Sequence, residues 1–114
     1  MAKILINIYN RLFNRKKKRF KKVLIVEGSA ATKAQEDTII IIRKNDSYAW
    51  AKLLCPCGCG REIALSLNRN IQPYWTVTIN KNDRNKVSFS PSIYLTGSPC
   101  KAHFFLKNNR IDWV

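Results

Sequence analysis

From about residue 23 to the end of the chain, apolar positions fall in short runs that are rich in β-branched and aromatic residues. Asn, Asp, Gly, Ser and Pro separate these runs, which is the pattern of strands joined by turns. The runs are KVLIVE (22–27), TIIIIRK (38–44), SYAWAKLL (47–54), EIALSL (62–67), YWTVTI (74–79), KVSFS (86–90), HFFLK (103–107) and RIDWV (110–114). The sequence therefore predicts a mainly β fold, a small antiparallel β domain over residues 23–114.

Two of the connections have the composition of hairpin loops. KNDRN at 81–85 and KNNR at 107–110 are short, polar and rich in Asn and Asp, which tolerate the backbone conformations of tight turns. The connection GSAATKAQED at 28–37 is longer and polar, and we expect a loop there with room for one helical turn.

Residues 1–22 have a different periodicity, because their apolar residues recur at helical spacing. These positions are Ile4, Leu5, Ile8, Tyr9, Leu12 and Phe13. The segment predicts a basic amphipathic helix that lies on an anionic membrane surface or docks into a partner's groove. The alternative is a helix that packs against its own domain.

The net charge of +14 is concentrated in that segment, since residues 1–22 hold nine of the 21 Lys and Arg residues and no acid. Nucleic acid is accordingly expected only as a non-specific, salt-sensitive partner. The charges follow the apolar part instead of preceding it, so the segment does not resemble a secretory signal, and it is too short in apolar residues to span a membrane. We expect a cytoplasmic protein, with contact at the inner face of the membrane through residues 1–22.

All four cysteines fall in two blocks, CPCGCG at 55–60 and SPCKAH at 98–103. In a reducing compartment, clustered thiols bind metal or do chemistry more often than they form disulfides. Glycine tolerates positive φ, so the C-x-C-x-C run can curl tightly and direct several sulfurs at one point. Zinc takes four ligands and suits either four thiolates or a set that includes His103, whereas the spacing does not match ferredoxin-type iron–sulfur runs. The residues leave both zinc ligand sets open.

The segments CPCGCGREIALSL, PYWTV, VSFSPSI, PCKAHFFL and RIDWV, in this order, resemble the BubE family of bacterial ubiquitination-like operons. The resemblance is close over residues 48–114 and implies a small protein encoded beside a ubiquitin-like modifier and E1-like and E2-like enzymes, which are the expected partners. It matches the cysteines and His103 to the family's cysteine and histidine blocks, and Pro91, Ser92 and Ile93 to its Pro-Ser-Ile block.

If Ser92 and His103 meet in space, they form the start of a serine-type hydrolase, in which the imidazole takes the hydroxyl proton. Asp112 and Glu62 are the candidates to orient the imidazole. The competing interpretation is an ordinary Ser-Pro-Ser turn and a histidine that binds zinc. We predict that zinc binds the four thiolates and that Ser92 and His103 are the catalytic residues. The predicted metal ligands are Cys55, Cys57, Cys59 and Cys100.

Three functions follow, in decreasing order of preference. The first is a zinc-stabilised serine-type peptidase that processes the ubiquitin-like protein or removes it from targets. The second is a non-catalytic zinc adaptor or ligase-like module for the E1-like and E2-like enzymes. The third is a zinc-bearing nucleic-acid binder that uses the basic segment.

Overall fold

A computed structural model describes residues 17–28, 31–97 and 99–114. These residues form eight strands and, within the described part, no α-helix. The strands are β1 (Lys22–Glu27), β2 (Thr38–Lys44), β3 (Ser47–Leu54), β4 (Glu62–Ser66), β5 (Thr76–Ile79), β6 (Val87–Tyr94), β7 (His103–Lys107) and β8 (Arg110–Trp113). Seven of the predicted apolar runs each contain one strand, and KVSFS covers only the first half of β6, which continues to Tyr94. The prediction of a mainly β fold is confirmed.

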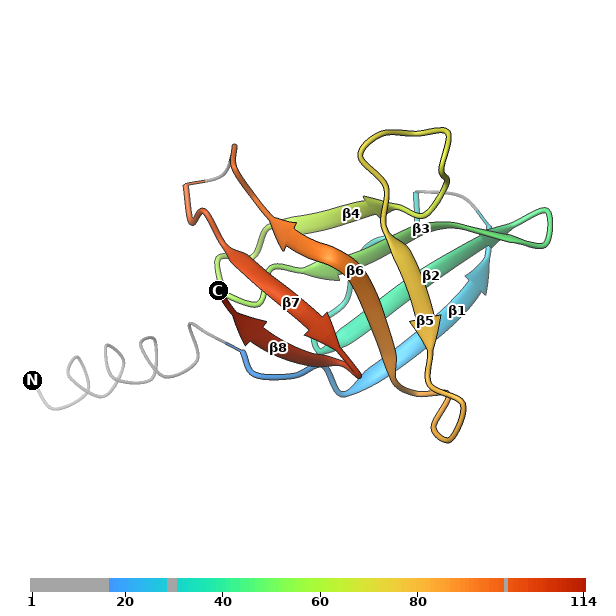
Figure 1. The fold of residues 1–114 in the computed structure, drawn as a ribbon, viewed down its shortest axis with the longest axis horizontal. Helices are drawn as coiled ribbons and strands as arrows, with labels where there is room; N and C mark the ends of the chain where they lie inside the picture. The colour runs from blue at the N-terminus through green and yellow to red at the C-terminus, as the bar shows by residue number, and fades with distance from the viewer. Residues whose placement is uncertain (1–16, 29–30, 98) are drawn as a thin grey trace, which may run out of the picture.

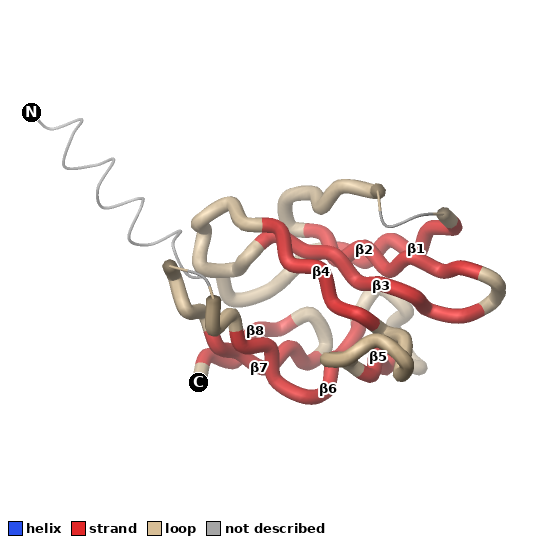
Figure 2. Tube along the Cα trace, turned by 90° about the horizontal axis from the view of Figure 1, so that it is seen from above, coloured by secondary structure: helices blue, strands red, loops and turns tan. Residues whose placement is uncertain are grey.

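The strands form two four-stranded sheets, one in the order β1-β2-β3-β4 and the other in the order β5-β6-β7-β8. Figure 2 shows them as two layers, one above the other. The expectation of a wholly antiparallel domain needs one correction, because β1 pairs with β2 in parallel. The connection over 28–37 causes this, since it returns the chain to the end of the sheet where β1 starts, so that β2 begins beside Lys22.

Both predicted hairpin loops are present. The loop between β5 and β6 contains KNDRN, and its Asn80 side chain accepts hydrogen bonds from the backbone of residues 82 and 83. The turn between β7 and β8 is Asn108–Asn109, and both residues have positive φ. That conformation suits a two-residue hairpin turn, which explains why asparagine occupies both positions.

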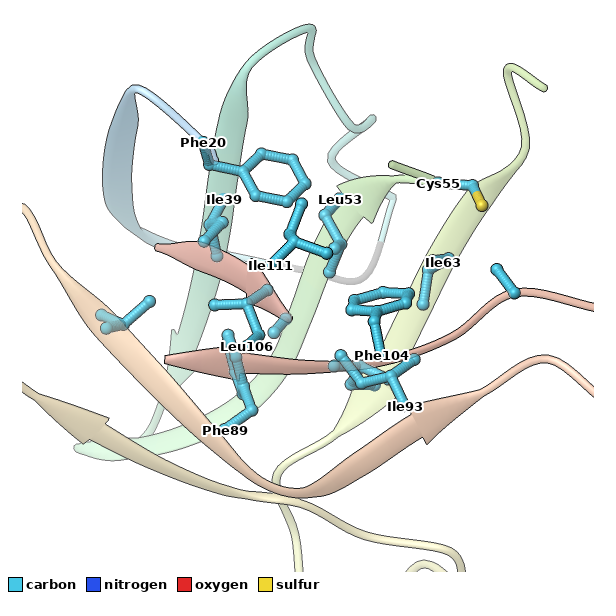
Figure 3. Packing of buried hydrophobic residues seen from close by; sticks show 14 of the residues in the cluster. Phe20, Ile39, Leu53, Cys55, Ile63, Phe89, Ile93, Phe104, Leu106 and Ile111 are labelled. Atoms are coloured by element: carbon cyan, nitrogen blue, oxygen red, sulfur yellow. The ribbon is translucent and has the colours of Figure 1, made fainter. Parts of the chain in front are cut away.

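The core lies between the two sheets, where side chains from both layers meet (Figure 3). In β7 the alternation of a strand is plain, since Phe104 and Leu106 are fully buried while Phe105 is 43% exposed on the other face. The buried residues of the sandwich include Ile39, Leu53, Ile63, Phe89, Ile93 and Ile111. Residues such as His103 that alternate with buried positions of β7 therefore lie on the outer face of the second sheet.

Residues 17–22 are part of this fold, and they are not helical. Lys18 and Phe20 form backbone hydrogen bonds with the β7–β8 hairpin: the Phe20 amide donates to Asn109 and the Ile111 amide donates to Lys18, each at 2.8 Å. The Phe20 side chain is 2% exposed and belongs to the core. The predicted helix over 1–22 is thus wrong for residues 17–22, because pairing with β8 holds this segment extended.

The remainder of that predicted helix, residues 1–16, lies outside the described residues. Within the described ranges, no helix is long and apolar enough to cross a membrane.

Candidate active site and cysteine cluster

An irregular stretch of β6 carries Ser92. The pairing between β6 and β7 shifts register between Phe89 and Ile93, and regular pairing resumes with Ile93 opposite Phe104 and Tyr94 opposite His103. Irregularities of this kind turn side chains away from the positions that a regular strand would give them. Ile93 is buried in the core, whereas Ser92 is half-buried and Tyr94 is half exposed.

The hydroxyl of Ser92 meets the ring of His103 across these two strands. Ser92 Oγ lies 2.9 Å from His103 Nε2, which is hydrogen-bonding distance. Eleven positions separate the two residues in sequence. The structure therefore places together the two side chains that a serine-type hydrolase uses as nucleophile and base.

Three further contacts hold this pair. The Tyr94 ring packs edge-on against the His103 ring, with centroids 4.4 Å apart. The Trp75 indole Nε1 donates a hydrogen bond to the Ser92 carbonyl at 3.3 Å, and the Val114 amide donates one to the His103 carbonyl at 3.0 Å. The backbone on both sides of the Ser92–His103 pair is thus tied to neighbouring segments.

The four cysteines converge at one point, because the loop after β3 meets the segment that leads into β7. Cys55 Sγ lies 3.4 Å from Cys57 Sγ and 3.8 Å from Cys100 Sγ, and Cys59 Sγ lies 4.0 Å from Cys100 Sγ. All four sulfurs lie within 4.8 Å of one another. Four sulfurs at about 2.3 Å around a tetrahedral zinc would be about 3.8 Å apart, so the cluster could hold a metal ion of this size.

The backbone of the loop explains this convergence. Gly58 and Gly60 have φ of 90° and 81°, a conformation that residues with a side chain rarely adopt. The Gly58 amide donates to the Cys55 carbonyl at 3.1 Å and the Cys55 amide donates to the Arg61 carbonyl at 2.8 Å, which closes the loop on itself. The glycines therefore let three alternate cysteines face the same point.

Burial raises the pKa of the Cys55 and Cys57 thiols above the ordinary value. A cation at the centre of the cluster would act in the opposite direction, because a metal ion favours the thiolate. The donor set has three sulfurs on the closed loop and a fourth from Cys100 before β7, and two of the four cysteines are buried, which fits a structural metal site. His103 is not part of this cluster, and its Nε2 faces Ser92.

A family model described as "Bacterial ubiquitination-like system serine protease (BubE)" matches residues 26–114. The chain belongs to the BubE family. The resemblance inferred from its motifs is thus confirmed. Searches of curated proteins and of solved structures found no match. The family's description as a serine protease agrees with a serine hydroxyl in hydrogen-bonding distance of an imidazole.

In this BubE-family chain the two acids considered as orienters of His103 have other partners. The Arg110 guanidinium lies 3.8 Å from Asp112. Glu62 accepts a hydrogen bond of 2.7 Å from the Ala34 amide and lies 3.4 Å from Lys52 Nζ. The Ala34 hydrogen bond and the Lys52 charge lower the pKa of Glu62. The arrangement among the described residues is therefore a Ser–His pair supported by Tyr94, and neither acid completes a triad.

Sequence reasoning missed Tyr94 and Trp75 as parts of this BubE-family site. The position of Tyr94 was a usable signal, because a residue two places after Ser92 in a strand lies on the same face. The role of Trp75 had no local signal, since its indole reaches Ser92 from the segment just before β5, 17 positions earlier in the chain.

Proposed function

We propose that this BubE-family protein is a zinc-stabilised serine-type peptidase that processes the ubiquitin-like protein of its system or removes it from targets. The observation that carries the proposal is the 2.9 Å approach of Ser92 Oγ to His103 Nε2. The pair is on the outer face of a sheet, where an extended protein tail can reach it. This position suits a macromolecular substrate.

The chemistry follows from the two side chains. Ser92 Oγ attacks the carbonyl carbon of the scissile bond, while its proton passes to His103 Nε2. The C–N bond then breaks, and the imidazolium gives this proton to the leaving amine. In the second half, water attacks the resulting ester and gives one proton to His103 Nε2. The Ser92 C–O ester bond then breaks, the imidazolium returns that proton to Ser92 Oγ, and the product acid loses its remaining proton to water as a carboxylate.

His103 must accept a proton at Nε2 for this role, so the neutral ring carries its proton on Nδ1. Tyr94 acts as a positioning residue, because its edge-on contact limits rotation of the imidazole. No acid among the described residues supplies a third member, so the mechanism uses a dyad, and the ring contacts perform the orienting role that an aspartate has in a triad.

Zinc would be held by Cys55, Cys57, Cys59 and Cys100. Its role would be to stabilise the fold. It would have no catalytic role, because a site closed by four thiolates has no open position for an activated water. Cys100 lies three residues before His103, and the other three ligands follow β3 of the opposite sheet. The site would therefore fasten the start of β7, and with it the base, to the other layer of the sandwich.

The test is cleavage of a C-terminally extended or conjugated ubiquitin-like protein of the same system. Ser92→Ala and His103→Ala should each lower kcat/KM on the order of a thousandfold or more, with metal content and melting temperature preserved, because neither side chain is a metal ligand in this proposal. Ser90→Ala is the matched control, since Ser90 is exposed on the same strand. If Ser92→Ala cleaved as well as the parent, or if His103→Ala released the metal, the assignment would be wrong.

A further inference from the structure

The strand that carries Ser92 extends past its neighbour on one side. β5 pairs with β6 only from Val87 to Ser90, yet β6 continues to Tyr94 (Figure 1). The chain before β5 diverges towards the other sheet, because the Trp75 amide donates to the Ser66 carbonyl at 2.8 Å. In the described part of the molecule, no strand lies beside the last residues of β6 on the β5 side.

The hydrogen-bonding groups of Tyr94 point towards this open side. The Leu95 amide donates to the Ala102 carbonyl of the segment before β7 at 2.9 Å. In an antiparallel pair, successive residues direct their N–H and C=O groups to opposite sides, so those of Tyr94 point away from β7. Ser92 is two residues before Tyr94, so its carbonyl should point to the same side of β6. The Trp75 indole reaches this carbonyl from the β5 side, which independently supports the direction of the Tyr94 groups.

The opposite edge of the same sheet differs. Residues 18–20 cover β8, with Arg19 bridged to Arg110 and the Ile111 amide donating to Lys18. An exposed strand edge is a template for pairing with an extended peptide. The fold thus covers the edge that is distant from Ser92 and leaves open the stretch two residues from it.

We propose that the open edge at Tyr94 binds the C-terminal tail of the ubiquitin-like substrate as an added antiparallel strand. The inference rests on the proposed peptidase function. A tail antiparallel to β6 runs in the direction of β5, so its C-terminal end leads from Tyr94 towards Ser92. The tail residue opposite Tyr94 donates its N–H to the Tyr94 carbonyl and accepts from the Tyr94 N–H.

Trp75 limits how far the tail can pair with β6. Its indole already occupies the Ser92 carbonyl on the open side, so the tail cannot continue to pair with β6 in the plane of the sheet. The tail then passes over the outer face, which is where the Ser92 hydroxyl and the His103 ring lie. The edge therefore acts as a track that aligns the tail and ends at the nucleophile.

The first test alters the substrate and leaves the enzyme intact. A synthetic peptide with the sequence of the modifier's tail, extended beyond the scissile bond, is N-methylated at one position at a time. N-methylation at one position before the scissile bond should lower kcat/KM at least about tenfold, because the N–H of that residue bonds to Tyr94. N-methylation of the residues on either side of it should change kcat/KM less than about twofold. Equal rates for all upstream N-methylated peptides would overturn the docking mode and leave the peptidase in place.

The second test removes the donor on the enzyme. Tyr94→Pro lacks the backbone N–H, and Tyr94→Ala is its matched control, because it loses the same ring and keeps the N–H. Proline is tolerated in a strand where the N–H is not used within the sheet, so both variants should retain metal and melt alike. The proline variant should cleave about tenfold less efficiently than the alanine variant, whereas equal kcat/KM for the two would contradict the inference.

Failure of the proposed function gives a different result, namely no cleavage of any parent peptide. In that case the docking is tested on the Ser92→Ala protein by hydrogen exchange of the Tyr94 amide in the presence of the unmodified tail peptide. Slower exchange at Tyr94, with no change at the Leu95 amide that is already bonded to Ala102, would support the docked strand. Unchanged exchange at Tyr94 would overturn it.

Discussion

Substitution of Phe20 tests whether the segment before β1 is part of the domain. Phe20 is 2% exposed, although it precedes the first strand and follows a run of basic residues. Its ring packs in the cluster formed by both sheets (Figure 3). Phe20→Ala removes this ring and leaves the backbone hydrogen bond to Asn109 available.

The magnitude follows from this burial. Replacing a fully buried phenylalanine by alanine costs about 3–5 kcal/mol, because the transfer free energy of the ring is lost and a cavity remains. For a domain of about 100 residues, 1 kcal/mol shifts the melting temperature by about 4–8 °C. We therefore expect Phe20→Ala to lower the melting temperature by on the order of 15 °C or more.

The assay is thermal unfolding followed by circular dichroism, with Phe105→Ala as the matched control. Phe105 is 43% exposed, so the same substitution there should cost less than about 1.5 kcal/mol. A chain that begins at residue 23 lacks Phe20 and should, like Phe20→Ala, be strongly destabilised. Equal melting temperatures for Phe20→Ala and Phe105→Ala would refute the assignment of residues 17–22 to the fold.

Two other predictions concern the metal and the charges. The purified protein should contain about one zinc per chain, and Cys100→Ser should lose the metal and lower the melting temperature, because a thiolate ligand is removed; less than half an equivalent in the parent would count against the site. A hydrogen bond from Lys17 lowers the pKa of Asp37, so this carboxylate stabilises the fold above its unfolded pKa and the stabilisation is lost as pH falls through the lowered pKa. Asp37→Asn is chosen because asparagine also tolerates the positive φ of this residue. It should lower the free energy of unfolding by about 0.5–1 kcal/mol at pH 7 and leave it unchanged at a pH where the parent carboxylate is protonated. A difference in urea unfolding that does not depend on pH would contradict this.

The sequence by itself determined the strands and their turns, since both depend on local properties. Short runs of β-branched or aromatic residues, bounded by turn residues, indicated β2 and β7, and the Asn108–Asn109 pair indicated the hairpin because asparagine tolerates positive φ. The cysteine loop was also predictable, since Gly58 and Gly60 allow the tight curl that brings alternate cysteines together. The family of the chain was also predictable, because each motif that carries the resemblance is a continuous stretch of sequence.

Only the tertiary structure decided how these pieces pair. The parallel alignment of β1 with β2, and the pairing of residues 18–20 with the β7–β8 hairpin, depend on contacts between distant segments that no local pattern specifies. The approach of Ser92 to His103 depends on a register shift between β6 and β7, and a shift of one residue would turn the serine to the other face. The open edge at Tyr94 likewise exists because β5 begins only at Thr76, opposite Ser90, a result of where the chain crosses from the other sheet.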